Sequence, residues 1–140
     1  MKVLGLEISG RDVRIIALEK AEGVISNYTG KYKPIRLEDD ENSGNVLLFK
    51  NTLFATLESF SPDIVVMNFR DSKASGKYAP SAISFKIEGL IQLYDKAIIC
   101  FAKPQTISAF FKKNSLEFTP EYSYQTYVLK LAFHHLKTKN

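Results

Sequence analysis

The chain has a single cysteine, no tryptophan and no long apolar run. Cys100 on its own can form neither an internal disulfide nor a Cys-x-x-Cys metal site, which excludes a disulfide-stabilised scaffold and a cysteine-based zinc site. The longest purely apolar stretch, AIICFA at 97–102, is far shorter than the ~20 residues that a membrane-spanning helix needs. The N-terminus places Glu7 inside what would be a signal peptide's apolar region and lacks a small-residue cleavage site. We therefore expect a cytoplasmic protein without a membrane partner.

The composition is that of an ordinary globular protein. Hydrophobic residues make up 45% and charged residues 24% of the 140 residues, and this length fits one domain spanning 1–140. The net charge is +4, and because the acidic segment EDDE at 38–41 contributes −4, the remainder carries +8. Such a basic body can contact a phosphate backbone or an acidic protein, although scattered lysines also serve solubility.

The first quarter of the chain predicts an antiparallel meander of three strands. Apolar residues alternate over 2–9 and β-branched residues are abundant over 12–19, with a short turn between the two segments. A third strand is predicted over 23–35, where Gly30 and Pro34 indicate a bulge or a frayed edge.

After the acidic segment the pattern changes to helices that alternate with apolar strands. Helices are predicted over 45–60, 79–96 with Pro80 in the first turn, 104–114, and from a Thr119 cap onward, and buried parallel strands over 63–69 and 96–103. The order β-β-β-α-β-α-β-α-α predicts an α/β fold: a mixed five-stranded sheet, three strands antiparallel and two parallel, with helices on both faces and the first strand central.

An acid in the middle of the first strand, within this order of elements, resembles the ribonuclease H superfamily. Three segments are similar to its RuvC-like branch. VLGLEISG at 3–10 resembles the opening strand that carries the family's first metal-binding acid, and Glu7 is at that position. VVMNF at 65–69 with SAISFKIEGLIQL at 81–93 resembles the fourth strand and the helix after it, and YQTYVLKLAFHH at 124–135 resembles the last helix.

The chain is also similar to a small, functionally uncharacterised bacterial family of such domains. That family shares VLGLEISG and GKYAPSAISFKIEGLIQL almost position by position. The resemblance covers nearly the whole chain and implies a single ribonuclease H-like domain.

The resemblance also implies a metal-binding acid cluster, and this sequence departs from it. Nucleases of this branch hold two Mg²⁺ ions with clustered acids. Glu7 keeps the first acid, but Asn68 stands at the second acidic position, and Tyr124 and Tyr127 stand at the last two. A carboxylate, an amide and phenols with a pKa near ~10 cannot neutralise two hard dications. We therefore expect no cofactor and no nuclease activity; Mg²⁺ or Mn²⁺ would be needed only if Glu88 or Glu121 supplied the lost charge.

Two interpretations of Glu7 remain open. It is either a remnant metal or ligand anchor at the end of the sheet where open α/β sheets bind ligands, or a buried acid hydrogen-bonded to Asn68 or to a tyrosine hydroxyl. Because an unpaired buried carboxylate costs several kcal/mol or raises its pKa, both interpretations require a partner. We favour the second.

A basic loop is the candidate binding surface. The segment RDSKASGK contains Arg70, Lys73 and Lys77, and Lys86 on the following helix extends it. The loop could bind phosphate, but it matches neither GxxxxGK[ST] nor GxGxxG, so we favour a flexible, solvated loop. His134 and His135 point about 100° apart on a helix, so they do not predict a metal site.

Three hypotheses of function follow. We favour a catalytically degenerate RuvC-like domain, a pseudo-nuclease that binds nucleic acid or a protein partner through the loop and its basic surroundings. The first alternative is a Mg²⁺- or Mn²⁺-dependent nuclease that uses Glu7 with unrecognised acids. The second alternative is a small interaction protein of the immunity or inhibitor type, whose acidic segment at 38–41 docks on a basic partner.

Overall fold

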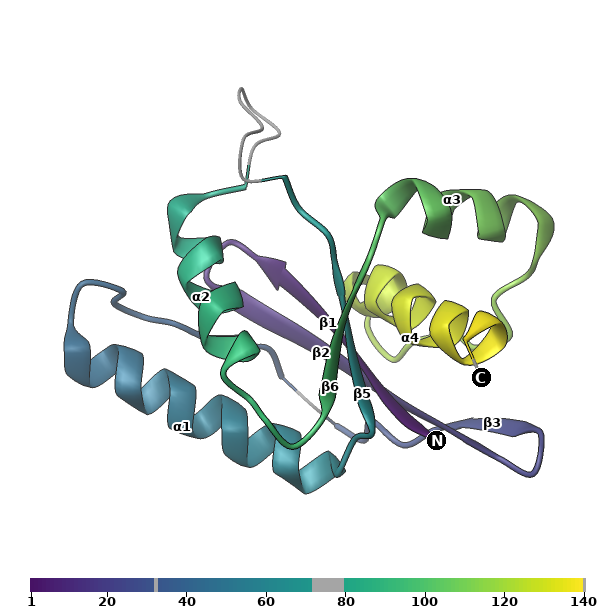
Figure 1. Ribbon diagram of the computed structural model, residues 1–140, viewed down its shortest axis with the longest axis horizontal. Coiled ribbons are helices and arrows are strands. Elements are labelled where there is room, and N and C mark those ends of the chain that lie inside the picture. The colour runs from purple at the N-terminus through teal and green to yellow at the C-terminus, as the bar shows by residue number, and fades with distance from the viewer. Residues whose placement is uncertain (32, 72–79, 140) are drawn as a thin grey trace.

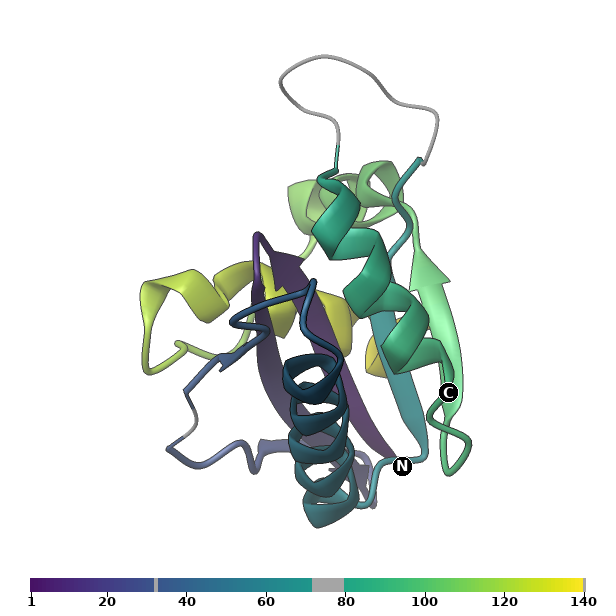
Figure 2. The same cartoon turned by 90° about the vertical axis from the view of Figure 1, so that its left-hand side faces the viewer.

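The computed structural model describes residues 1–31, 33–71 and 80–139. Within these ranges one mixed sheet carries helices on both faces (Figures 1 and 2). The strands are β1 (Lys2–Ser9), β2 (Asp12–Ala21), β3 (Val24–Asn27), β4 (Ile35–Arg36), β5 (Ile64–Asn68) and β6 (Ile98–Ala102). The helices are α1 (Ser43–Phe60), α2 (Ala82–Gln92), α3 (Pro104–Lys113) and α4 (Thr126–Thr138), with a 3₁₀ turn, η1, at Ser123–Gln125. None of the described helices is long and apolar enough to cross a membrane.

Strand β1 is central, as its apolar alternation predicts. The strand order is β3-β2-β1-β5-β6, with β1 antiparallel to β2 and parallel to β5. Both faces of β1 are covered, because Leu4 and Leu6 are fully buried on one side and Val3 on the other. Period-two alternation therefore assigns Glu7 to the Val3 face.

Two hydrophobic cores lie on opposite faces of the sheet. Helices α1 and α2 cover the face of Leu4 and Leu6, and α3 and α4 cover the face of Val3 (Figures 1 and 2). Helix α4 lies directly on the backbone of β1, since a β-carbon added at Gly5 would overlap the carbonyl oxygen of Val128. This close approach brings the first turn of α4 over the end of β1 that carries Glu7.

The predicted third strand is divided in two, so the sheet has six described strands rather than five. Strands β3 and β4 both pair with β2, and Gly30, at φ +70°, lies between them. The Thr29 hydroxyl accepts a hydrogen bond from the Ala17 N–H at 2.8 Å. The Thr29 side chain thus replaces one backbone hydrogen bond to β2 beyond the end of β3.

Two helix starts also differ from the prediction. Pro80 precedes the N-cap Ser81, and α2 ends at Gln92. The last helix begins at Thr126 and not at a Thr119 cap, because the backbone N–H of Tyr122 donates to the side chain of Gln125 and starts the 3₁₀ turn η1 instead.

Candidate functional site

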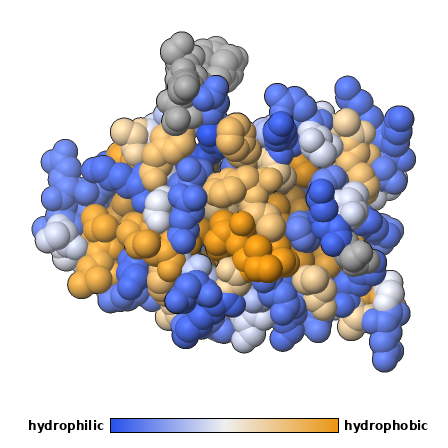
Figure 3. All heavy atoms as spheres, viewed as in Figure 1, coloured by the Kyte–Doolittle hydropathy of each residue, from blue (hydrophilic) through white to orange (hydrophobic). Residues whose placement is uncertain are grey.

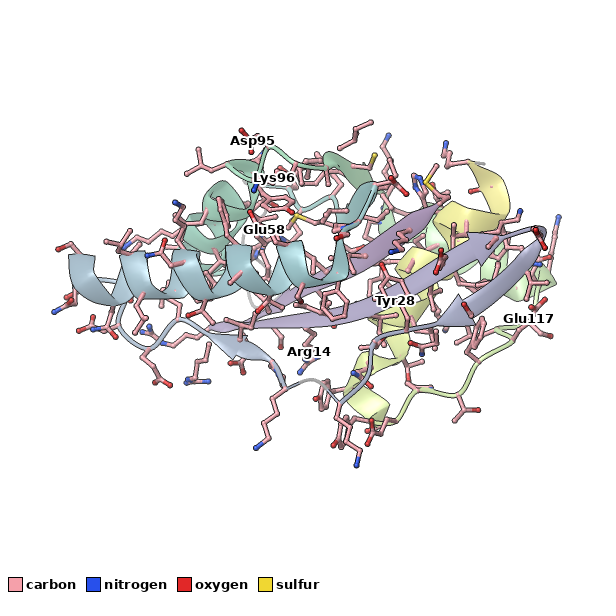
Figure 4. The ribbon with its side chains drawn as sticks, turned by 90° about the horizontal axis from the view of Figure 1, so that it is seen from below. Arg14, Tyr28, Glu58, Asp95, Lys96 and Glu117 are labelled. Carbon is pink, nitrogen blue, oxygen red and sulfur yellow. The ribbon has the colours of Figure 1, made fainter. Side chains whose placement is uncertain are left out.

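Glu7 forms an ion pair across the first hairpin. Glu7 and Arg14 are direct partners in the β1–β2 register, and Arg14 Nη1 donates to Glu7 Oε1 at 3.3 Å. The side chains are 22% and 29% exposed, respectively, and Arg14 projects from β2 away from α1 (Figure 4). Burial raises the pKa of Glu7, and the hydrogen bond and positive charge of Arg14 oppose that rise. The acid at this position therefore already has a cationic partner.

Asn68 and Tyr127 meet beside this pair. Asn68 is the last residue of β5, one position beyond the Leu6–Met67 pair of the parallel β1–β5 register, and so lies at the same end of the sheet as Glu7. The Tyr127 hydroxyl donates to Asn68 Oδ1 at 2.6 Å. Burial raises the pKa of Tyr127, against the effect of the Asn68 hydrogen bond, and the negative charge of Glu7 raises it further. Asn68 and Tyr127, which match two acidic positions of the family, are thus joined by a hydrogen bond between uncharged groups.

Two further tyrosines extend the site to the surface. The Arg14 guanidinium lies over the ring of Tyr124, 5.3 Å from its centroid. Tyr124 in turn stacks on Tyr122, with ring centroids 5.5 Å apart and an angle of 3° between the planes. Tyr122 is 42% exposed. The outcome is a continuous row, Glu7–Arg14–Tyr124–Tyr122, that runs from the sheet to solvent.

Sequence reasoning missed Arg14 and Tyr122. The sequence did contain a signal for Arg14. A two-residue turn at positions 10 and 11 pairs Ser9 with Asp12, and in the same antiparallel register Glu7 lies opposite Arg14. No comparable signal marks Tyr122, which precedes η1 in a segment without regular periodicity.

The residues present do not fit a two-metal centre. Of the four matched positions, Glu7 alone is a carboxylate, and Arg14 neutralises it. Across the described residues no group of three or more His, Cys, Asp or Glu is placed to hold a metal ion, and residues 32, 72–79 and 140 include none of these types. Two hard dications require several anionic oxygens.

Neither acid considered as a substitute joins Glu7. Glu88 forms an ion pair with Arg70 at 3.1 Å on α2, the helix that covers the opposite face of the sheet. Glu121 is exposed and lines a shallow pocket with Thr29 and Lys31.

Of the predicted basic surface, Lys86 is exposed to solvent and Arg70 is largely buried. Arg70 is 15% exposed; its Nη2 donates to the Ser84 carbonyl and to Glu88, both at 3.1 Å, and its guanidinium lies over the Phe85 ring. Arg70 therefore ties the end of β5 to α2. Lys86 reaches solvent but contacts Asp40 at 2.9 Å, and Lys73 and Lys77 lie outside the described residues.

The acidic segment is also engaged within the chain. Asp40 accepts hydrogen bonds from Lys86 at 2.9 Å and Arg11 at 3.1 Å, and these bonds hold the pKa of its carboxyl below its usual range. Arg36 contacts Glu38 at 3.6 Å. Part of the segment's charge is thereby balanced by neighbouring strands and by α2.

Comparison with known proteins places this architecture. A family described as "Protein of unknown function (DUF3010)" matches residues 1–134. The chain belongs to this family. No curated protein matches the chain in sequence.

Solved structures identify the fold of this DUF3010 member. Thermus thermophilus RuvC is similar with a TM-score of 0.73 and 11% identity, over 97% of this chain and 93% of RuvC. The same enzyme in complex with Holliday junction substrate gives a TM-score of 0.68 and 12% identity, over 97% and 93% of the two chains. Fowlpox virus resolvase in complex with substrate Holliday junction DNA gives 0.55 and 14%, over 99% of both chains. The predicted RuvC-like ribonuclease H fold is confirmed.

Proposed function

We propose that this protein is a catalytically degenerate RuvC-like domain that binds branched nucleic acid. The observation that carries the proposal is the Glu7–Arg14 ion pair, which stands where the resemblance expects a metal-binding acid. A cation supplied by the protein takes the place of a metal ion, and the hydroxyl of Tyr127 on Asn68 takes the place of two further acids. The same end of the sheet would then bind nucleic acid without hydrolysing it.

Two features support nucleic acid as the ligand. Two solved structures with this fold are complexes with Holliday junction DNA. In this chain, the exposed ring of Tyr122 and the cation of Arg14 lie in one row, and such a row can stack on unpaired bases and attract phosphates. Lys86, which reaches solvent on α2, remains a predicted contact, as do Lys73 and Lys77, whereas Arg70 would act by holding the end of β5 to α2.

Binding is tested with a labelled four-way junction and a linear duplex of equal length, measured by fluorescence anisotropy at increasing salt. We expect tighter binding of the junction and an affinity that falls linearly with the logarithm of salt concentration. Arg14→Gln and Tyr122→Ala should each weaken junction binding, and Lys50→Gln, on α1 across the sheet from Arg14, serves as the matched control. Equal, salt-independent association with both DNAs would refute the proposal and leave a protein partner as the better hypothesis.

Hydrolysis is tested separately by incubating the junction with Mg²⁺ or Mn²⁺. We expect the DNA to stay intact. Cleavage that Glu7→Gln abolishes would instead establish the nuclease alternative, and cleavage that persists in Glu7→Gln would remove Glu7 from the mechanism.

A further inference from the structure

A second concave site lies beside the edge strand β6, away from the Glu7–Arg14 pair. Strand β6 pairs with β5 alone among the described strands, and apolar surface gathers over the part of the molecule where it runs (Figure 3). The pocket has a volume of about 640 Å³ and lies between β6, the start of α3 and the end of α4. Pockets of a few hundred Å³ hold ligands of nucleotide size. It is lined by Val66, Cys100, Phe101, Ala102, Lys103, Thr106, His134, His135, Thr138 and Lys139.

The polar side of this pocket is basic. Lys103, Lys139, His134 and His135 line it, and none of the described residues that line it is Asp or Glu. Lys103 is the N-cap of the ten-residue helix α3, and no side chain caps that N-terminus. Pro104 has no N–H, and the amides of Thr106 and Ile107 donate to the Lys103 carbonyl, so Gln105 is left to offer an amide of the first turn to an anion. The charge of the two lysines therefore favours a negatively charged group, while the negative end of the α4 dipole offsets the positive end of α3.

The imidazole of His134 forms no hydrogen bond with another group in the described part of the chain. Its residue is 8% exposed, and its ring lies edge-on to Phe110 at 5.0 Å. Burial, together with the positive charge of Lys139, lowers the pKa of His134, so the imidazole is neutral at pH 7. This ring lines the pocket, where its nitrogens are available to a ligand. A ligand that accepts a hydrogen bond there would satisfy it.

We propose that this pocket binds a phosphate ester of nucleotide size. The phosphate would lie between Lys103 and Lys139 at the start of α3, within reach of His134. The two lysines match the charge of a phosphate dianion better than that of a single carboxylate, and a neutral imidazole can donate one N–H to it. The remaining wall, formed by Val66, Cys100 and Phe101, is apolar and would contact the organic part of the ligand.

The phosphate could belong to a free nucleotide or to the end of a nucleic acid strand, and titration calorimetry distinguishes the two. The probes are adenosine monophosphate, adenosine, and a short oligonucleotide with a 5′-phosphate or a 5′-hydroxyl. We expect saturable binding of adenosine monophosphate and none of adenosine. Tighter binding of the 5′-phosphorylated oligonucleotide than of the free nucleotide would identify a strand end as the source, and the reverse order a free nucleotide.

The variant Lys103→Ala/Lys139→Ala tests the placement of the phosphate, and Lys112→Ala/Lys113→Ala is the matched control. The control removes the same charge from the other end of α3, outside the pocket. We expect the first variant to weaken adenosine monophosphate binding about tenfold or more and the second to change it less than about twofold. Equal weakening in both variants, equal affinity for adenosine, or no saturation at millimolar nucleotide would overturn the proposal.

Nitrogen NMR of the His134 ring provides an independent readout. Binding of inorganic phosphate should raise the titration midpoint of this imidazole, since an anion beside it stabilises the charged form. His134→Phe keeps the ring against Phe110 and should weaken phosphate binding while the protein stays folded by circular dichroism. An unchanged midpoint at saturating phosphate would exclude His134 from the site. The inference does not rest on the proposed junction binding, and either can fail while the other holds.

Discussion

The Glu7 carboxylate and the Arg14 guanidinium lie 3.3 Å apart, on directly opposed positions of the first hairpin. Both side chains are less than one third exposed, so their interaction is less screened than that of a surface pair. The pair answers why an acid interrupts an otherwise apolar strand: its charge is balanced by the neighbouring strand.

Arg14→Gln should destabilise the protein by about 1 to 3 kcal/mol, because it leaves a half-buried carboxylate without its cation. Urea unfolding at neutral pH measures the change. Arg36→Gln is the control, since its pair with Asp12 is more exposed and should contribute less than about 1 kcal/mol. Equal losses in the two variants would mean that the Glu7–Arg14 pair is no stronger than a surface contact.

Glu7→Gln should remove a pH dependence of stability. The pKa of Glu7 is raised in the folded state, so the folded protein binds the proton more tightly than the unfolded chain. This contribution is fully present below the unfolded pKa of 4.5 and is lost as the pH rises through the folded pKa. Glu7→Gln, which cannot ionise, should therefore be more favourable relative to the wild type at pH 7 than at pH 4. Urea unfolding at both pH values measures this, and a pH-independent difference would contradict the raised pKa.

Gly5→Ala should destabilise the protein by about 3 kcal/mol, because the new methyl group would overlap backbone atoms of α4 and force the helix off β1. Gly89→Ala is the control: no atom lies within 4 Å of the added carbon in α2, and alanine there should stabilise by about 0.5 to 1 kcal/mol. Thermal unfolding of the two variants compares them. A tolerated Gly5→Ala would show that α4 does not lie directly on β1.

Tyr127→Phe should cost about 1 kcal/mol, because Asn68 loses the hydrogen bond that it accepts at 2.6 Å. A double-mutant cycle with Asn68→Ala isolates the pair, and the coupling should be close to the whole effect of Tyr127→Phe. Tyr122→Phe, which removes an exposed hydroxyl, is the control. Additive effects of the two substitutions would mean that the bond does not contribute to folding.

The site could be predicted in part because each strand carries its own period. Alternation over 2–9 determined that β1 is a strand, that it is buried on both faces and that Glu7 shares a face with Val3. Resemblance along the chain then identified Asn68 and Tyr127 as neighbours of Glu7 in the fold, and the structure brings all three to one end of the sheet.

Other features depended on contacts between residues far apart in the sequence. By itself, the sequence determined the order of helices and strands, apart from the divided third strand, and the central place of β1, because these follow from local periodicity. The resemblance to RuvC-like domains matched non-acidic residues to three of the four acidic positions. Only the tertiary structure decided that Arg70 turns to Glu88, that Asp40 is held by Lys86, and that the strand after β2 divides at Gly30. The sequence offers several acids that could pair with Arg70 or several bases that could pair with Asp40, and it allows one long strand or two short ones after β2. The packing of helices and strands against one another determines which of these forms.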